Sequence, residues 1–94
     1  MNKIRHLTLI EGSFTGEEAR EILTSIFYSK INFHETKNWS SQERFGKEDT
    51  IAQKRIPALK NEMEKLQEIL SEAKAKNKRL VINSEINISF ADDL

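Results

Sequence analysis

The sequence contains no cysteine, and this absence limits how the fold is stabilised. Without a thiol, the 94 residues form neither disulfides nor a thiolate metal site. The absence also fits a reducing compartment, so we expect a cytoplasmic protein. Long apolar runs are missing too: nothing approaches the roughly 18 consecutive apolar residues of a membrane span. The N-terminus is basic, but its apolar run is interrupted and lacks a small-residue cleavage site, so we expect no signal peptide.

The chain also lacks an excess of charge of one sign. It has 15 basic and 15 acidic residues. A nucleic-acid-binding domain is usually basic overall, because its affinity comes largely from neutralising phosphates. The balance therefore argues against nucleic acid as a partner, although it leaves room for a local basic face. The length predicts one small domain, residues 1–94.

The first part of the chain predicts a strand followed by a helix. Residues 3–11 are rich in aliphatic and β-branched side chains, which indicates a strand. Alternation would place Leu7 and Leu9 on one face and Ile10 on the other. Thr15 and Glu18 then have the spacing of a capping box, which predicts a helix over 16–34. Its apolar stripe comprises Ala19, Ile22, Leu23, Ile26, Phe27, Ile31 and finally His34.

A second, longer helix is predicted over residues 50–77. Thr50 with Gln53 offers a cap at its start, and Asn77 suits a left-handed position at its end. We expect the helix to be kinked at Pro57 or to begin with a short separate segment before it. Its apolar residues alternate spacings of four and three, as in a coiled-coil seam: Ala52, Ile56, Leu59, Met63, Leu66, Leu70 and Ala73.

Residues 78–90 alternate apolar and polar side chains, which is typical of a half-buried strand. The pattern leaves open whether they form one strand or a hairpin turning at Asn83 and Ser84. The resulting order is strand, helix, helix, strand, and the two long helices predict an antiparallel hairpin. The fold class is therefore α+β, with β-α-α-β order and terminal strands that pair antiparallel. Acidic residues at the start of the first helix would then lie beside Lys74, Lys76, Lys78 and Arg79.

A two-stranded ribbon on a helical hairpin has a thin core and two open sheet edges. A second copy would remedy both, either through edge-to-edge pairing or through a four-helix bundle. We therefore expect a homodimer.

Residues 35–49 separate the two predicted helices and hold the only tryptophan. Ser40 with Glu43 fits another capping box, so one interpretation is an elbow with a single helical turn that Gly46 ends. The other is a recognition surface for an unidentified protein, since Trp and Arg are favoured binding anchors. The candidate partner surface consists of Trp39, Glu43, Arg44, Phe45 and Lys47.

No pattern in the sequence predicts a catalytic, metal or cofactor site. Neither histidine has a second ligand at metal-binding spacing, and His34 ends an apolar stripe, which favours a structural role. Ser13, Ser40 and Ser41 lie outside known nucleophile motifs. An enzyme acting through His34 and Glu43 is the least favoured hypothesis.

Three short motifs carry a resemblance: Phe14–Ala19 (F-T-G-E-E-A), Lys30–His34 (K-I-N-F-H) and Ser40–Gly46 (S-S-Q-E-R-F-G). Together they resemble a set of short, uncharacterised bacterial proteins. The resemblance implies a cytoplasmic bacterial protein and transfers no catalytic residue or ligand. The function we expect is a non-catalytic homodimeric interaction or regulatory module. The alternative is a nucleic-acid-binding regulator that uses Lys54, Arg55, Lys60 and Lys65 of the long helix.

Overall fold

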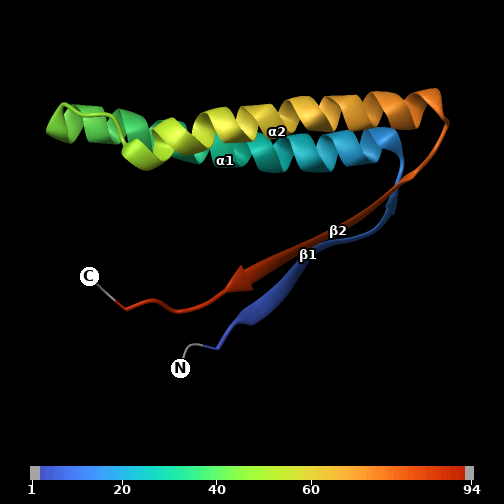
Figure 1. The fold of residues 1–94 in the computed structure, drawn as a ribbon, viewed down its shortest axis with the longest axis horizontal. Coiled ribbons are helices and arrows are strands. Elements are labelled where there is room, and N and C mark those ends of the chain that lie inside the picture. Colours follow the sequence, from blue (N-terminus) through green and yellow to red (C-terminus); the bar gives the residue numbers. More distant parts are fainter. Residues whose placement is uncertain (1–2, 93–94) are drawn as a thin grey trace.

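The fold was obtained as a computed structural model that describes residues 3–92 (Figure 1). Its elements are β1 (Arg5–Phe14), α1 (Gly16–Phe45), α2 (Thr50–Ala75) and β2 (Leu80–Ile88). The two helices lie side by side, and β1 and β2 pair antiparallel in a ribbon that leaves one end of the hairpin. This order and pairing confirm the predicted α+β fold.

Helix α1 begins at the predicted capping box. The backbone N–H of Glu18 donates to Thr15 Oγ1 at 3.1 Å, and the backbone N–H of Thr15 donates to Glu18 Oε1 at 2.9 Å. The bonds from the Thr15 backbone and side chain, with a smaller contribution from Arg79, hold the pKa of Glu18 below its ordinary value. The ionised Glu18 thus stabilises the start of α1.

Replacing Thr15 with alanine is expected to cost about 1 kcal/mol of unfolding free energy, because a helix N–H loses its partner. The lowered pKa of Glu18 adds a pH dependence. Its contribution is complete above the ordinary pKa of glutamate and is lost as the pH falls through the lowered value of the folded state. Urea unfolding of the wild type and Thr15→Ala across the acid range measures both effects. The Glu18→Gln variant should show a flatter acid limb, and an unchanged limb would contradict this account.

Helix α1 is longer than predicted. It continues through residues 35–45 and ends at Phe45, where Gly46 adopts the left-handed conformation with φ 66° and donates its N–H to Gln42. The predicted helix end at 34 and the elbow over 35–49 are therefore wrong, and Ser40 does not open a separate turn. No glycine or proline interrupts residues 35–45, so the hydrogen-bond ladder runs on. The true connection is residues 46–49.

Helix α2 starts at residue 50, as predicted, but its cap lies one residue earlier than predicted. Asp49, rather than Thr50, is the N-cap, and its carboxylate accepts the N–H of Ala52 at 2.9 Å. The helix is continuous across Pro57, so there is no separate first segment. It ends at Ala75 rather than 77, and Asn77 has the predicted left-handed backbone with φ 53°.

The ribbon has a bulge that the alternation did not predict. The register pairs Thr8 with Glu85 and Ile10 with Ser84, which leaves Leu9 as an extra residue on β1. The bulge moves Leu7 onto the same face as Ile10, so the predicted faces of β1 are wrong. β1 also begins and ends later than the predicted 3–11. β2 is one strand rather than a hairpin, and it is shorter at both ends than the predicted 78–90.

The core lies where the hairpin meets the base of the ribbon. It consists of Ala19 from α1 with Leu66 and Leu70 from α2, and five half-buried side chains pack around it: Phe14, Leu23, Phe27, Leu80 and Ile82. Beside this core, Arg20 Nη1 donates to Gln67 Oε1 at 2.9 Å, which links the two helices. Beyond its base the ribbon diverges from α1 (Figure 1).

Candidate interaction surfaces

The far end of α1 projects beyond the start of α2. The backbone N–H of Asp49 donates to Asn38 Oδ1 at 2.7 Å, so α2 begins beside Asn38, two turns before α1 ends. Figure 1 shows this green end of α1 with the short connection folded back over it. No part of α2 covers the projecting turns, which explains why Trp39 is 63% exposed and Phe45 71% exposed.

The projecting end does not assemble the predicted surface into one patch. At about 100° per residue, Trp39 and Glu43 lie one turn apart on the same side of α1. Arg44 and Phe45 lie on other sides, and Lys47 is in the connection after Gly46. Arg44 and Phe45 instead line a shallow hollow with Lys37 and Asp49, among others. A single partner would therefore contact part of the predicted set.

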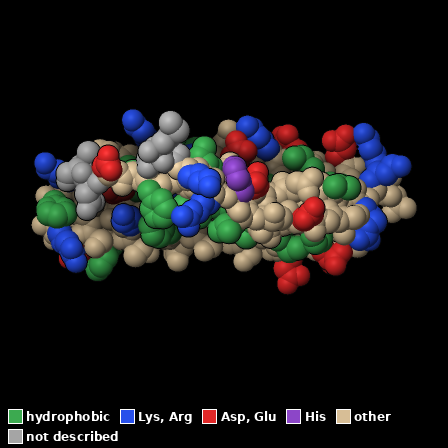
Figure 2. Space-filling model, turned by 90° about the horizontal axis from the view of Figure 1, so that it is seen from below, with side chains coloured by type: hydrophobic (Ala, Val, Ile, Leu, Met, Phe, Trp, Pro, Cys, Tyr) green, Lys and Arg blue, Asp and Glu red, His purple; other side chains and the backbone are tan. Residues whose placement is uncertain are grey.

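Charged side chains gather at the opposite end of the hairpin, as the sequence indicated. Figure 2, seen from the ribbon side, shows basic groups at the end where α1 starts and α2 finishes, with acidic groups beside them. Glu17 and Arg20 line a hollow with Lys74, Lys78 and Arg79. The capping box already occupies part of the start of α1, and Arg79 donates to the Ser13 carbonyl at 3.0 Å. These hydrogen bonds link the base of the ribbon to this end of the hairpin.

The inner face of the ribbon is the largest feature that the sequence did not reveal. Because paired residues share a face, Leu7, Ile86 and Ile88 lie on the same side as Leu80 and Ile82, which pack on the core. Yet Leu7 is 54% exposed, Ile86 40% and Ile88 43%. An apolar strand face this open is unusual in a monomer, since such patches mark interaction sites. The sequence did not reveal this face because alternation alone does not predict the bulge at Leu9, which brings Leu7 onto it.

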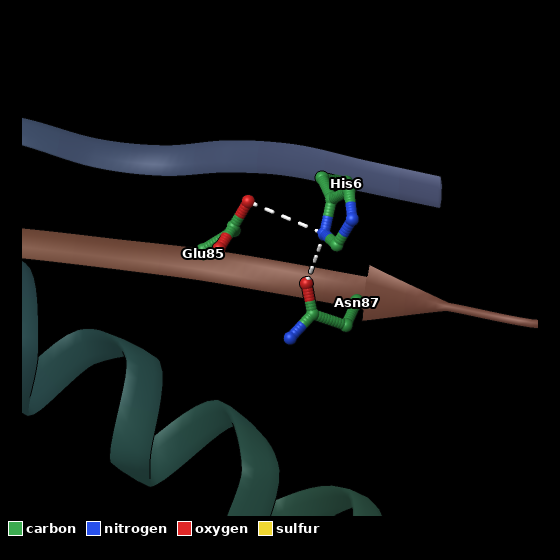
Figure 3. Close-up of polar contacts among 3 residues, drawn as sticks. All are labelled: His6, Glu85 and Asn87. Carbon is green, nitrogen blue, oxygen red and sulfur yellow. Dashed lines mark hydrogen bonds and ion pairs between the residues drawn. The ribbon is translucent and has the colours of Figure 1, made fainter. Parts of the chain in front are cut away.

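The outer face of the ribbon carries a polar cluster (Figure 3). His6 Nδ1 lies 2.6 Å from Asn87 Oδ1 and 3.3 Å from Glu85 Oε1. The bonds join β1 to β2 across a cross-strand pair. Both His6 and Glu85 are more than half exposed, so nothing shields them from water for acid–base chemistry. The cluster adds exposed cross-strand contacts to the ribbon.

The structure does not bring together His34 and Glu43, the two residues of the enzyme hypothesis. His34 is buried against α2, whereas Glu43 is exposed and about 180° away around α1. Within residues 3–92, no three His, Asp or Glu side chains converge to hold a metal ion. In that same range, neither helix combines the length and apolar character that crossing a membrane requires.

Comparison with known proteins assigns no family. No protein-family model, curated protein or solved structure matches this chain. Its function is therefore inferred from the surfaces described above.

The basic residues of the nucleic-acid alternative do not share one face of α2. Lys54 and Lys65 lie within about 20° of each other, whereas Arg55 and Lys60 lie about 100° and 120° away on opposite sides. Lys65 is also paired with Glu62 at 3.1 Å. A phosphate backbone would meet two of these four charges at once, which weakens this alternative.

Proposed function

We propose that this chain is a non-catalytic protein–protein interaction module that acts as a homodimer in the bacterial cytoplasm. The supporting observation is the large solvent-accessible area of a single chain. Its accessible area is 7948 Å², whereas a compact monomer of this length exposes about 5,600 Å². The excess of about 2,400 Å² is well above the roughly 800 Å² that each partner contributes to a standard interface.

The dimensions of the chain support the same proposal. Its radius of gyration is 16.9 Å, against about 12 Å for a compact domain of this length. A two-stranded ribbon that stands away from its core is marginally stable in water, so a partner is needed to hold it. The chain carries no net charge. Two copies therefore approach each other without overall electrostatic repulsion.

The projecting end of α1 is the proposed surface for a different protein. It presents exposed Trp39 beside Glu43 on one side, and Arg44 and Phe45 beside a shallow hollow on another. Aromatic and arginine side chains are the commonest binding anchors. Trp39 is the only tryptophan, so its fluorescence reports directly whether a partner covers this end.

Light scattering after size-exclusion chromatography tests the proposal. Protein purified from its own host is expected to elute with the mass of two chains at micromolar concentration, without nucleic acid. The mass of one chain would overturn the homodimer. An ultraviolet absorbance ratio typical of nucleic acid, abolished by salt, would replace the proposal with the nucleic-acid alternative.

A further inference from the structure

The ribbon diverges from α1 beyond the core (Figure 1), and we call the two sides that face each other the walls of a wedge. We define the wedge by its exposed apolar side chains: Leu7, Ile86 and Ile88 on the ribbon, and Ile26 and Phe33 on α1. The ribbon wall is a continuation of the face that packs on the core at Leu80 and Ile82. The two walls meet at the core and diverge beyond it (Figure 1).

The α1 wall follows from helix geometry. Ala19 is fully buried where the ribbon meets the hairpin. Ile26 and Phe33, two and four turns farther along, point within about 40° of the Ala19 direction. Ile26, Phe27 and Phe33 also line an open groove that reaches Leu59 of α2. The apolar stripe of α1 thus has one part that packs on α2 and another that faces the ribbon without touching it.

The wedge has no occupant within the described chain. The ribbon packs on the hairpin only around its base, and β1 and β2 are hydrogen-bonded to each other, so neither strand folds back across the space. An occupant must therefore be apolar toward the ribbon wall and flat enough to enter between a strand pair and a helix. The inner face of another copy's ribbon meets both conditions, and a chain without net charge does not repel a second copy overall.

We infer that the wedge holds the ribbon of a second copy. The inner faces of the two ribbons pack face to face around a two-fold axis near the Leu7–Ile86 pair. Each ribbon then lies between the ribbon and the α1 helix of the other copy. Such an interface is isologous, because the same patch serves both copies and the contact closes at two chains. This inference rests on the proposed homodimer and names its interface.

The arrangement accounts for features that other dimers leave unexplained. Edge-to-edge pairing into a four-stranded sheet would satisfy strand edges but would leave Leu7, Ile86 and Ile88 in water. Packing hairpin on hairpin would leave the same residues bare. In this dimer, the outer face of the entering ribbon brings Glu85 toward α1, where Lys30 Nζ lies 5.2 Å from the centre of the Phe33 ring. An acidic group thus approaches a cation.

The chain's lack of cysteine permits a direct test. Leu7→Cys places the only thiol on the inner face, and Thr8→Cys places it on the outer face of the same strand as a matched control. Packed sheets lie about 10 Å apart, so two inner-face thiols come within reach of a short bis-maleimide, while outer-face thiols are separated by both sheets. We expect Leu7→Cys to give a cross-linked two-chain band and Thr8→Cys to give none.

The other outcomes separate this inference from the proposed function. Equal cross-linking of Leu7→Cys and Thr8→Cys would indicate edge-to-edge strands and overturn the wedge interface while keeping the homodimer. No cross-link in either variant, with the mass of two chains in light scattering, would indicate hairpin packing. This outcome too would overturn the wedge interface while keeping the homodimer. The mass of one chain would overturn both. If Leu7→Cys fails to fold by circular dichroism, Ile86→Cys with Glu85→Cys as its control applies the same test from β2.

Discussion

Replacing Leu70 with alanine is expected to remove a large part of the stability of this protein. Leu70 is 3% exposed and packs with Ala19 and Leu66 where the ribbon joins the hairpin. Truncating a buried leucine costs about 2–5 kcal/mol, because apolar contacts are lost and a cavity remains. A chain of this length has only about 5–14 kcal/mol in total. One substitution therefore removes a substantial fraction of it.

Thermal and urea unfolding, followed by far-ultraviolet circular dichroism, measure this loss. At about 4–8 °C per kcal/mol, the midpoint of Leu70→Ala should fall by roughly 8 °C or more. The matched control is Ile69→Ala, which shortens the neighbouring side chain on the half-exposed side of α2 and should cost far less. All variants must be compared at one protein concentration, because dimerisation contributes to the apparent stability. Equal losses at the two positions would contradict the described core.

The sequence predicted α2 well because its periodicity is complete. Of the seven seam residues, Ala52, Leu59, Leu66, Leu70 and Ala73 are buried, and Ile56 and Met63 are half-buried. A seam repeated every three and four residues has one consistent partner direction, so burial follows from the pattern alone. The capping box of α1 was predictable for a similar reason, since its bonds are local.

The end of α1 was not predictable from the same local rules. Ser40 and Glu43 have capping-box spacing, but a serine also fits inside a helix when nothing interrupts the ladder before it. The decisive contact is tertiary: Asn38 binds the backbone N–H of Asp49, which sets where α2 begins. The projecting surface with Trp39 is a consequence of this contact, and no spacing in residues 35–49 encodes it.

The broad apolar stripe of α1 contained two faces that sequence periodicity merged into one. Ala19, Ile31 and His34 are buried, whereas Ile26 is exposed although it belongs to the same stripe. Similarly, strict alternation separated Leu7 from Ile10, whereas a bulge shifts the register by one residue and puts both on the same face. Helix and strand periods predict which residues are apolar neighbours. They do not predict the angle at which a ribbon leaves a hairpin, and that angle creates the wedge.

Replacing His34 with leucine is expected to stabilise the protein. The side chain is 5% exposed, and neither ring nitrogen has a hydrogen-bond partner within the described chain. Its ring lies edge-to-face with Phe33, with ring centroids 5.4 Å apart. A buried polar group without a partner costs about 1–3 kcal/mol, so an apolar side chain of similar volume should raise the unfolding free energy by a comparable amount.

Urea unfolding at neutral pH measures the change, with His6→Leu as the control. His6 is exposed and bonds to Asn87, so its loss should have a small or slightly destabilising effect. A lower unfolding free energy for His34→Leu would contradict this account and indicate a polar partner for His34 beyond the residues that the structure describes. Repeating the measurement with added Zn²⁺ would then distinguish a metal from a second protein, because a metal bound only by the folded wild type raises its stability in proportion to the logarithm of metal concentration.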